Sequence, residues 1–206
     1  MSRKLLSLTA LGAASLMALT ACSGGTASSS QSSTSATASS SSSAPSSITI
    51  ESDQGNVEIK LPVQRVASLD NRTFEVLAQW NIPLVAAPKK LIPSTVKAYN
   101  TDSVADIGMH RDPNLEALAA SNPDLIISGQ RFTRFDSQIA EMNPGVPLIN
   151  LEPRDGKPLN EELIRQVTDL GEIFGHQEDA KKLVDDFNNA LNRAKKAYDG
   201  KSTVMA

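Results

Sequence analysis

The stretch Asn122-Pro123-Asp124-Leu125-Ile126-Ile127 decides the fold that the sequence predicts. Its Asn-Pro pair ends a preceding helix, and the three apolar residues that follow form the continuous run typical of a strand buried on both faces. Pro147-Leu148-Ile149-Asn150-Leu151 has the same character. Such strands occur in parallel sheets that helices cover on both sides, so the sequence predicts an α/β fold.

Three further short strands are expected upstream of this stretch. Arg65-Val66-Ala67-Ser68-Leu69 and Pro83-Leu84-Val85-Ala86-Ala87 are β-prone runs, and Ile107-Gly108 ends another extended piece. Helical patterns stand between these strands. Because strand and helix alternate, we expect mostly parallel pairing with right-handed crossovers, as in a Rossmann-like lobe.

The helices expected in this part of the chain have recognisable starting signals. Asp70-Asn71 is read as the cap of a helix over residues 74–80, and Asp112-Pro113 as the cap and first-turn proline of a helix over residues 114–120. A weaker helix is expected over residues 94–99.

Both ends of the folded region also carry clear patterns. Residues 48–52 and 57–61 alternate apolar and polar side chains around Asp53-Gln54-Gly55-Asn56, which predicts a β-hairpin. Residues 178–198 repeat apolar side chains at helical spacing, which predicts a helix about 30 Å long. Asp199-Gly200 ends that helix, and residues 201–206 resemble the beginning of a new strand.

The N-terminal region predicts export and attachment to a membrane. A basic start and a short apolar run make residues 1–21 a signal peptide. Leu19-Thr20-Ala21-Cys22 resembles a bacterial lipobox, in which the only cysteine, Cys22, receives the lipid. The alternative is cleavage after Ala21 beside an incidental cysteine. Residues 22–47 are read as a lipidated cysteine and a serine-rich flexible leash, so the folded part begins at residue 48.

Composition and motifs exclude several classes of function. A net charge of −3 argues against binding to nucleic acid. His110 and His176 are the only histidines, and neither has a cysteine or second histidine at metal-ligand spacing, so no metal site is expected. Ser128, Thr73 and Asp70 could suggest a hydrolase triad, but no Gly-x-Ser-x-Gly motif is present. The chain is therefore not expected to be an enzyme.

Several sequence motifs together resemble those of a known family. Beyond the lipobox and the leash, they are Val66-Ala67-Ser68-Leu69-Asp70, Asp112-Pro113-Asn114-Leu115-Glu116-Ala117-Leu118, Asn122-Pro123-Asp124-Leu125-Ile126-Ile127 and Leu170-Gly171-Glu172-Ile173-Phe174-Gly175. The chain resembles the iron-siderophore substrate-binding lipoproteins of ABC importers, a family that also includes vitamin B12 and haem binders. The resemblance covers residues 57–206 and implies two α/β lobes joined by one long helix, with the ligand between them.

This resemblance implies a division of the chain. Residues 48–175 form the first lobe, residues 176–200 the linking helix, and residues 201–206 only the start of a second lobe. The resemblance thus implies an extracytoplasmic, lipid-anchored receptor on the cell membrane that delivers a ferric siderophore to an ABC permease. The alternative is a truncated or incomplete fragment with no transport activity of its own.

Basic residues after two predicted strands are the candidate ligand-binding residues. Lys89 and Lys90 follow one strand, and Arg131 and Arg134 follow another, after Gly129, which is expected to allow a sharp turn. Strand ends in open α/β sheets are where ligands bind. Arginine stacks on rings and donates paired hydrogen bonds, which suits an anionic catecholate complex of iron. The alternatives are solvated loop charges, or a haem or B12-like ligand.

Three more residues have weaker or indirect roles. His110 and Arg111 follow another predicted strand and are possible ligand-binding residues. Glu116 lies near the start of a helix, where a carboxylate is stabilised by the helix dipole alone. The resemblance implies a second role, in which Glu116 points out of the lobe and pairs with a basic patch on the permease.

Overall fold

The computed structural model describes residues 45–198 and residue 200 of the chain. The expected signal peptide, Cys22, all but the last residues of the leash and the strand at residues 201–206 lie outside the described residues. In the part of the chain that is described, no helix has the length and apolar character needed to cross a membrane.

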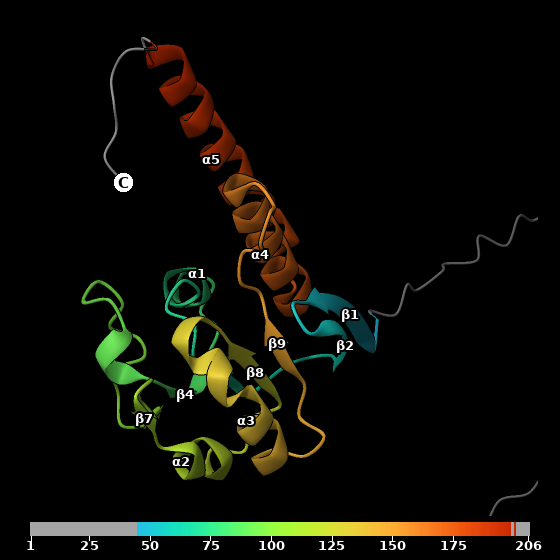
Figure 1. Cartoon of the computed structure of the whole chain (residues 1–206), viewed down its shortest axis with the longest axis vertical. Helices are drawn as coiled ribbons and strands as arrows, with labels where there is room; N and C mark the ends of the chain where they lie inside the picture. The colour runs from blue at the N-terminus through green and yellow to red at the C-terminus, as the bar shows by residue number, and fades with distance from the viewer. Residues whose placement is uncertain (1–44, 199, 201–206) are drawn as a thin grey trace, which may run out of the picture. The chain divides into compact units, whose positions relative to one another are not determined.

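A five-stranded parallel sheet forms the centre of the lobe, as the sequence predicts (Figure 1). Its strands lie in the order β5-β4-β3-β8-β9. In chain order they are β3 (Val66–Ser68), β4 (Leu84–Ala87), β5 (Ala105–Asp106), β8 (Leu125–Ser128) and β9 (Leu148–Asn150). The chain runs outward from β3 to β5 and then returns to place β8 on the other side of β3. The strand order therefore reverses between β3 and β8, the position where open α/β sheets bind ligands.

Helices cover both faces of this sheet. They are α1 (Phe74–Gln79), α2 (Leu115–Ala120), α3 (Asp136–Met142), α4 (Leu159–Phe174) and α5 (Gln177–Ala197). Along β8, Leu125 and Ile127 face the core shared with α1 and α4, whereas Ile126 faces the core shared with α2 and α3. Both faces of β8 are buried, which explains its continuous apolar run. The sequence interpretation did not include α3 and α4.

Three expected local features are wrong. Thr73, not Asp70 or Asn71, is the N-cap of α1, and the Asp70 carboxylate is bonded to Arg72 instead of capping the helix. Asn114 caps α2, since its side chain accepts a hydrogen bond from the Ala117 amide. Asp112–Pro113 instead forms the short strand β7, paired with β6 (Gly108–Met109).

The expected helix over residues 94–99 is also wrong. The chain makes successive turns there, with the Val96 amide bonded to the Pro93 carbonyl at 2.9 Å. Val96 and Tyr99 are both buried against the lobe. Their three-residue spacing therefore reflects packing of an irregular segment and not a helix face.

The N-terminal hairpin is confirmed and is tighter than expected. β1 (Ser47–Ser52) and β2 (Gly55–Lys60) pair as far as Ser52 and Gly55, so only Asp53 and Gln54 form the turn. Ile50 and Ile59 are buried in the core that contains α4.

The long helix is confirmed as α5, which packs its first turns on α4. The two helices meet at Gly171 and Ala180, where a Cβ atom on Gly171 would lie 2.6 Å from the Ala180 Cβ. His176, at the start of α5, stacks on Trp80 of the lobe with ring centroids 5.2 Å apart. Figure 1 shows α5 running antiparallel to α4 and continuing past the beginning of α4. Accordingly, Phe187 and Tyr198 are exposed.

Candidate ligand-binding site

A hollow of about 170 Å³ lies beside the carboxyl ends of β3 and β8, where the strand order reverses. Its walls come from the loops after these strands, from the 3-10 turn η1 (Lys89–Leu91) after β4, and from the segment between β6 and β7. The lining residues are Leu69, Asn71, Leu91, His110, Gln130, Arg131 and Phe132.

Asp70 organises the base of this region. Its side chain is fully buried, and its carboxylate pairs with Arg72 at 2.8 Å. The carboxylate also accepts hydrogen bonds from the side-chain amides of Gln130 and Gln166, each at 3.3 Å. A buried charge needs such partners. Asp70 therefore joins the loop after β3, the loop after β8 and helix α4.

The glycine after β8 has a different role from the one expected. Gly129 has φ of 171°, which is extended backbone, so the expectation of a sharp turn there is wrong. The turn residue is Gln130, with φ of 54°. Glycine is required because a Cβ atom at residue 129 would lie 2.8 Å from the Asp70 side chain. The close approach brings the loop against Asp70.

Gln130 and Asn71 are site residues that the sequence interpretation missed. The Gln130 side-chain amide donates to the Asn71 side-chain oxygen, and its backbone amide donates to Glu152 Oε1 at 2.6 Å. Both residues line the hollow. Their position in the sequence could have identified them, because Asn71 and Gln130 follow buried strands as closely as the charged residues do.

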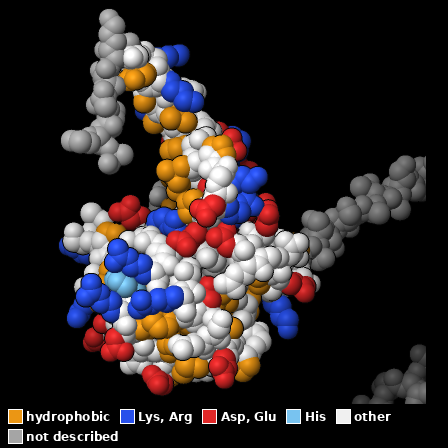
Figure 2. All heavy atoms as spheres, viewed as in Figure 1, with side chains coloured by type: hydrophobic (Ala, Val, Ile, Leu, Met, Phe, Trp, Pro, Cys, Tyr) orange, Lys and Arg blue, Asp and Glu red, His pale blue; other side chains and the backbone are white. Residues whose placement is uncertain are grey.

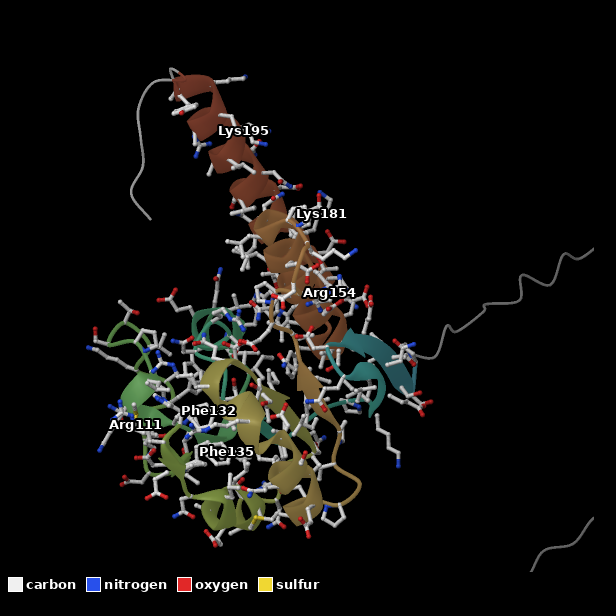
Figure 3. The ribbon with its side chains drawn as sticks, in the orientation of Figure 1. Arg111, Phe132, Phe135, Arg154, Lys181 and Lys195 are labelled. Carbon is white, nitrogen blue, oxygen red and sulfur yellow. The ribbon has the colours of Figure 1, made fainter. Side chains whose placement is uncertain are left out.

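Arginine side chains surround His110 at the rim of the hollow. Arg131 Nη1 lies 3.3 Å from His110 Nε2, and Arg134 Nη2 donates to the His110 carbonyl oxygen. The Arg134 guanidinium also lies over the Phe135 ring, 4.6 Å from its centroid. Figure 2 shows Lys and Arg side chains gathered around a histidine on this face, and Figure 3 shows Arg111 on the same side of the lobe as Phe132 and Phe135.

This cluster carries uncompensated positive charge. Among residues 45–198, no carboxylate lies within ion-pair distance of Arg111, Arg131 or Arg134. Partial desolvation, with repulsion from these three guanidinium groups, lowers the pKa of His110 below its ordinary value of 6.5. The positive charge at the rim therefore favours the binding of an anion.

The predicted site residues are only partly brought together. Arg131 and His110 line the hollow, while Arg134 and Arg111 flank His110 without lining it. Lys89 Nζ donates to the Thr101 carbonyl at 2.6 Å. Lys90 is exposed, and the residue that η1 contributes to the wall is Leu91.

Other candidates from the sequence have clear positions. Glu116 is exposed in the first turn of α2. Ser128 Oγ donates to Asp136, and Thr73 Oγ1 donates to the Asp70 carbonyl at 2.8 Å, so neither hydroxyl is bonded to a histidine. Among the described residues, no three His, Cys, Asp or Glu side chains are grouped to hold a metal ion.

Comparisons with known proteins agree on the fold. A family model described as periplasmic binding protein matches residues 66–206. The ferric-anguibactin-binding protein FatB of Vibrio anguillarum is 32% identical over 139 residues, which are 66% of this chain and 43% of FatB. The petrobactin-binding protein YclQ of Bacillus subtilis is 20% identical over 146 residues, 70% of this chain and 45% of YclQ. The chain thus spans less than half the length of these curated relatives.

Solved structures show the same architecture. The crystal structure of YclQ from Bacillus subtilis superposes with a TM-score of 0.66 at 20% identity, covering 73% of this chain and 53% of that structure. The siderophore-binding protein BauB, solved with two acinetobactin molecules and ferric iron, gives a TM-score of 0.64 at 24% identity, covering 71% and 52%. At these identities the likeness concerns the fold.

Proposed function

Because the chain belongs to the periplasmic binding protein family, we propose that it forms one lobe of an extracytoplasmic receptor that captures a ferric siderophore for an ABC importer. The family is one of substrate-binding proteins and not of enzymes. The names of two relatives, a ferric-anguibactin-binding protein and a petrobactin-binding protein, support an iron-siderophore ligand. Since those relatives are more than twice as long as the matched segment, the lobe is proposed to supply one wall of the binding site.

The observation that carries this proposal is the cluster of unpaired arginine side chains at the hollow. Arg131 lines the hollow beside His110, and Arg111 and Arg134 add positive charge at its rim. A ferric catecholate complex is anionic and presents aromatic rings, and guanidinium groups bind both features. The Asn71 and Gln130 amides offer neutral hydrogen-bonding groups beside them. We therefore favour a catecholate over an uncharged ligand, with haem or a B12-like molecule as the alternative.

Titration with two probes of different charge tests this function. The chain is expected to bind the ferric complex of a triscatecholate more tightly than an uncharged ferric hydroxamate complex. Arg131→Ala should weaken catecholate binding by about 1.5–3 kcal/mol, the range for a hydrogen bond to a charged group. Arg193→Ala removes an exposed arginine of α5 and serves as the matched control. Equal affinity of the Arg131 variant and parent, or preference for the hydroxamate, would contradict the assignment.

Anchoring and division of the chain form part of the same proposal. Residues 1–21 are the signal peptide, Cys22 carries the lipid, and the rest of residues 22–47 link it to the lobe. Residues 48–175 form the lobe, residues 176–200 the linking helix and residues 201–206 the start of a second lobe. This arrangement holds the receptor at the outer face of the cell membrane, because dual or triple acylation is sufficient for stable attachment.

Glu116 is proposed to contact the permease. Its position in the first turn of α2 leaves the side chain exposed for a basic partner surface. In a reconstituted transporter that contains the partner permease, Glu116→Lys should abolish uptake while siderophore binding in solution is retained. Undiminished uptake would exclude the role, and Glu141→Lys on α3 controls for a reversed surface charge.

A further inference from the structure

The segment that carries Arg131 and Arg134 is held at both of its ends. This segment, η2 (Gln130–Phe135), begins after Gly129, which lies directly against Asp70. It ends at Asp136, whose side chain is buried at the start of α3. Ser128 Oγ, at the end of β8, donates to Asp136 Oδ1. Phe132 is buried within η2, and the exposed Arg131 and Arg134 thus lie between two fixed ends.

The second donor to Asp136 comes from the other end of the lobe sequence. Gln54, in the turn of the β1-β2 hairpin, donates from Nε2 to Asp136 Oδ2 at 2.6 Å, although 82 residues separate the two. The hairpin lies before the segment that the family model matches, which begins at residue 66. Gln54 thus links the hairpin turn to the first residue of α3, directly after η2.

The hairpin turn is itself fixed to the sheet. The Asp53 amide donates to the Asn150 carbonyl at 3.0 Å, and the Asn150 amide donates to Ser52 Oγ at 2.9 Å. Asn150 is the last residue of β9 and pairs in register with Ser128 of β8. Gln54 accordingly extends from a turn that is bonded to the end of β9, next to the end of β8 that bonds Asp136.

We propose that the hairpin turn positions the ligand-binding segment, with Gln54 and Asp136 acting as positioning residues that fix the course of η2 and hence the placement of Arg131. Neither residue lines the hollow. The positioning itself concerns the lobe alone, whereas its effect on affinity rests on the proposed function.

The chemistry of Asp136 explains why the contact matters. A buried carboxylate loses hydration and needs a donor on each oxygen, which Ser128 and Gln54 supply. Burial raises the pKa of Asp136, and the two hydrogen bonds act in the opposite direction. Without Gln54, Oδ2 is left with no donor among the described residues. Hydration of this oxygen then favours a shift of the start of α3 toward water, and η2 shifts with it because the two are consecutive in the chain.

Amide hydrogen exchange on the full chain tests the positioning without any ligand. Gln54→Ala and Asp136→Ala should speed exchange of the amides of residues 130–135 by about fivefold or more, while the amides of β8 keep their rates. Asp136→Asn keeps an acceptor for Gln54 and can donate to Ser128, so it should preserve the slow exchange. Lys60→Ala, an exposed change on the same hairpin, is the matched control.

Titration with the ferric triscatecholate complex gives the second readout. Gln54→Ala should weaken binding about five- to tenfold, and the single substitution Asp136→Asn should leave the affinity at the parental value. Unchanged exchange of residues 130–135 in Gln54→Ala would overturn the proposal, even if Asp136→Ala does not fold. Equal acceleration across β8 and η2 would also overturn it, because that result indicates general destabilisation. If exchange responds as expected but the parent chain binds no siderophore, the positioning stands and the proposed function fails.

Discussion

At the scale of single residues, the site depends on contacts that residue type alone does not reveal. The sequence indicated that Gly129 makes a sharp turn, but Gln130 makes that turn in the structure. Its contact with Asp70 joins residues 59 positions apart, and no local pattern encodes such an approach. The basic side chains were predictable because they follow strand ends. Which of them line the hollow was not, since that depends on the loop path.

The first prediction at this scale concerns Gly129. Gly129→Ala should lower the free energy of unfolding by about 1–3 kcal/mol, the usual cost of inserting a methyl group into a filled site. The backbone angle is permissive, so the cost comes from the Asp70 contact. Urea denaturation measures it, with the exposed Ser137→Ala as control. A loss no larger than that of the control would show that Asp70 can move aside.

The second concerns the protonation of His110. Its lowered pKa means that the fold favours the neutral ring, so the stability from this group is present above about pH 6.5 and is lost as pH falls through the lower folded value. Arg131→Gln should raise the His110 pKa, and so should an anion that binds the cluster. Proton NMR titration with and without sulfate resolves this, because the chain has only two histidines and His176 serves as the reference. Identical His110 titration curves under all these conditions would contradict the electrostatic description of the rim.

At the scale of secondary-structure elements, the strands were more predictable than the helices that cover them. Continuous apolar runs mark β8 and β9 because both faces of the sheet are buried. Helix α4 escaped prediction because its buried face includes Glu162, Gln166 and Gly171, which interrupt the apolar periodicity. Glu162 is tolerated there because hydrogen bonds from Arg154 lower its pKa to about 2. Arg154 lies in the segment before α4, outside the helical repeat, so this ion pair leaves no periodic signal.

The same helix gives a pH-dependent prediction. Burial raises the pKa of Asp169 to about 6 from 3.8, although Arg165 at 3.3 Å acts in the opposite direction. A raised carboxyl pKa gives stability that is complete below pH 3.8 and is lost as pH rises through about 6. Asp169→Asn should therefore gain about 1–2 kcal/mol of unfolding free energy relative to the parent between pH 4 and pH 7.

Urea denaturation at the two pH values, with Glu161→Gln as the matched loss of charge on α4, measures this gain. A constant difference between the Asp169 variant and the parent at both pH values would show that the carboxyl titrates normally.

At the scale of the whole molecule, the described residues form one lobe and the long helix α5, in a family whose relatives are more than twice the matched length. The covering of both sheet faces was predicted from the continuous apolar runs of β8 and β9, and the long helix from its apolar periodicity, although α3 and α4 were not predicted. The arrangement of the strands required the structure, because short strands do not reveal their order. The reversal between β3 and β8 then located the site without reference to any conserved motif.

The prediction at this scale is that Cys22 attaches the molecule to the membrane. Cys22→Ser removes the thiol that accepts the lipid, so the mature protein should move from the membrane fraction to the medium or the periplasm. Fractionation followed by immunoblotting measures the shift. Ser23→Ala, a neighbouring change that keeps the thiol, is the control, and undiminished membrane retention of Cys22→Ser would contradict lipidation.

The contact between Gly171 and Ala180 fixes α5 near one end, so a small change of angle there moves its other end by a larger distance. The helix is fixed near its first turns, where Ala180 meets Gly171 and His176 stacks on Trp80, while its later turns are mostly exposed. At about 1.5 Å per residue, its 21 residues span about 30 Å. The part of α5 from Ala180 to Ala197 is about 26 Å long, so a tilt of about 5° at the Gly171 contact displaces the far end by about 2 Å. A methyl group added at Gly171 would push Ala180 away and tilt α5. The displacement of the C-terminal end of α5 would then be larger than the displacement at the contact itself.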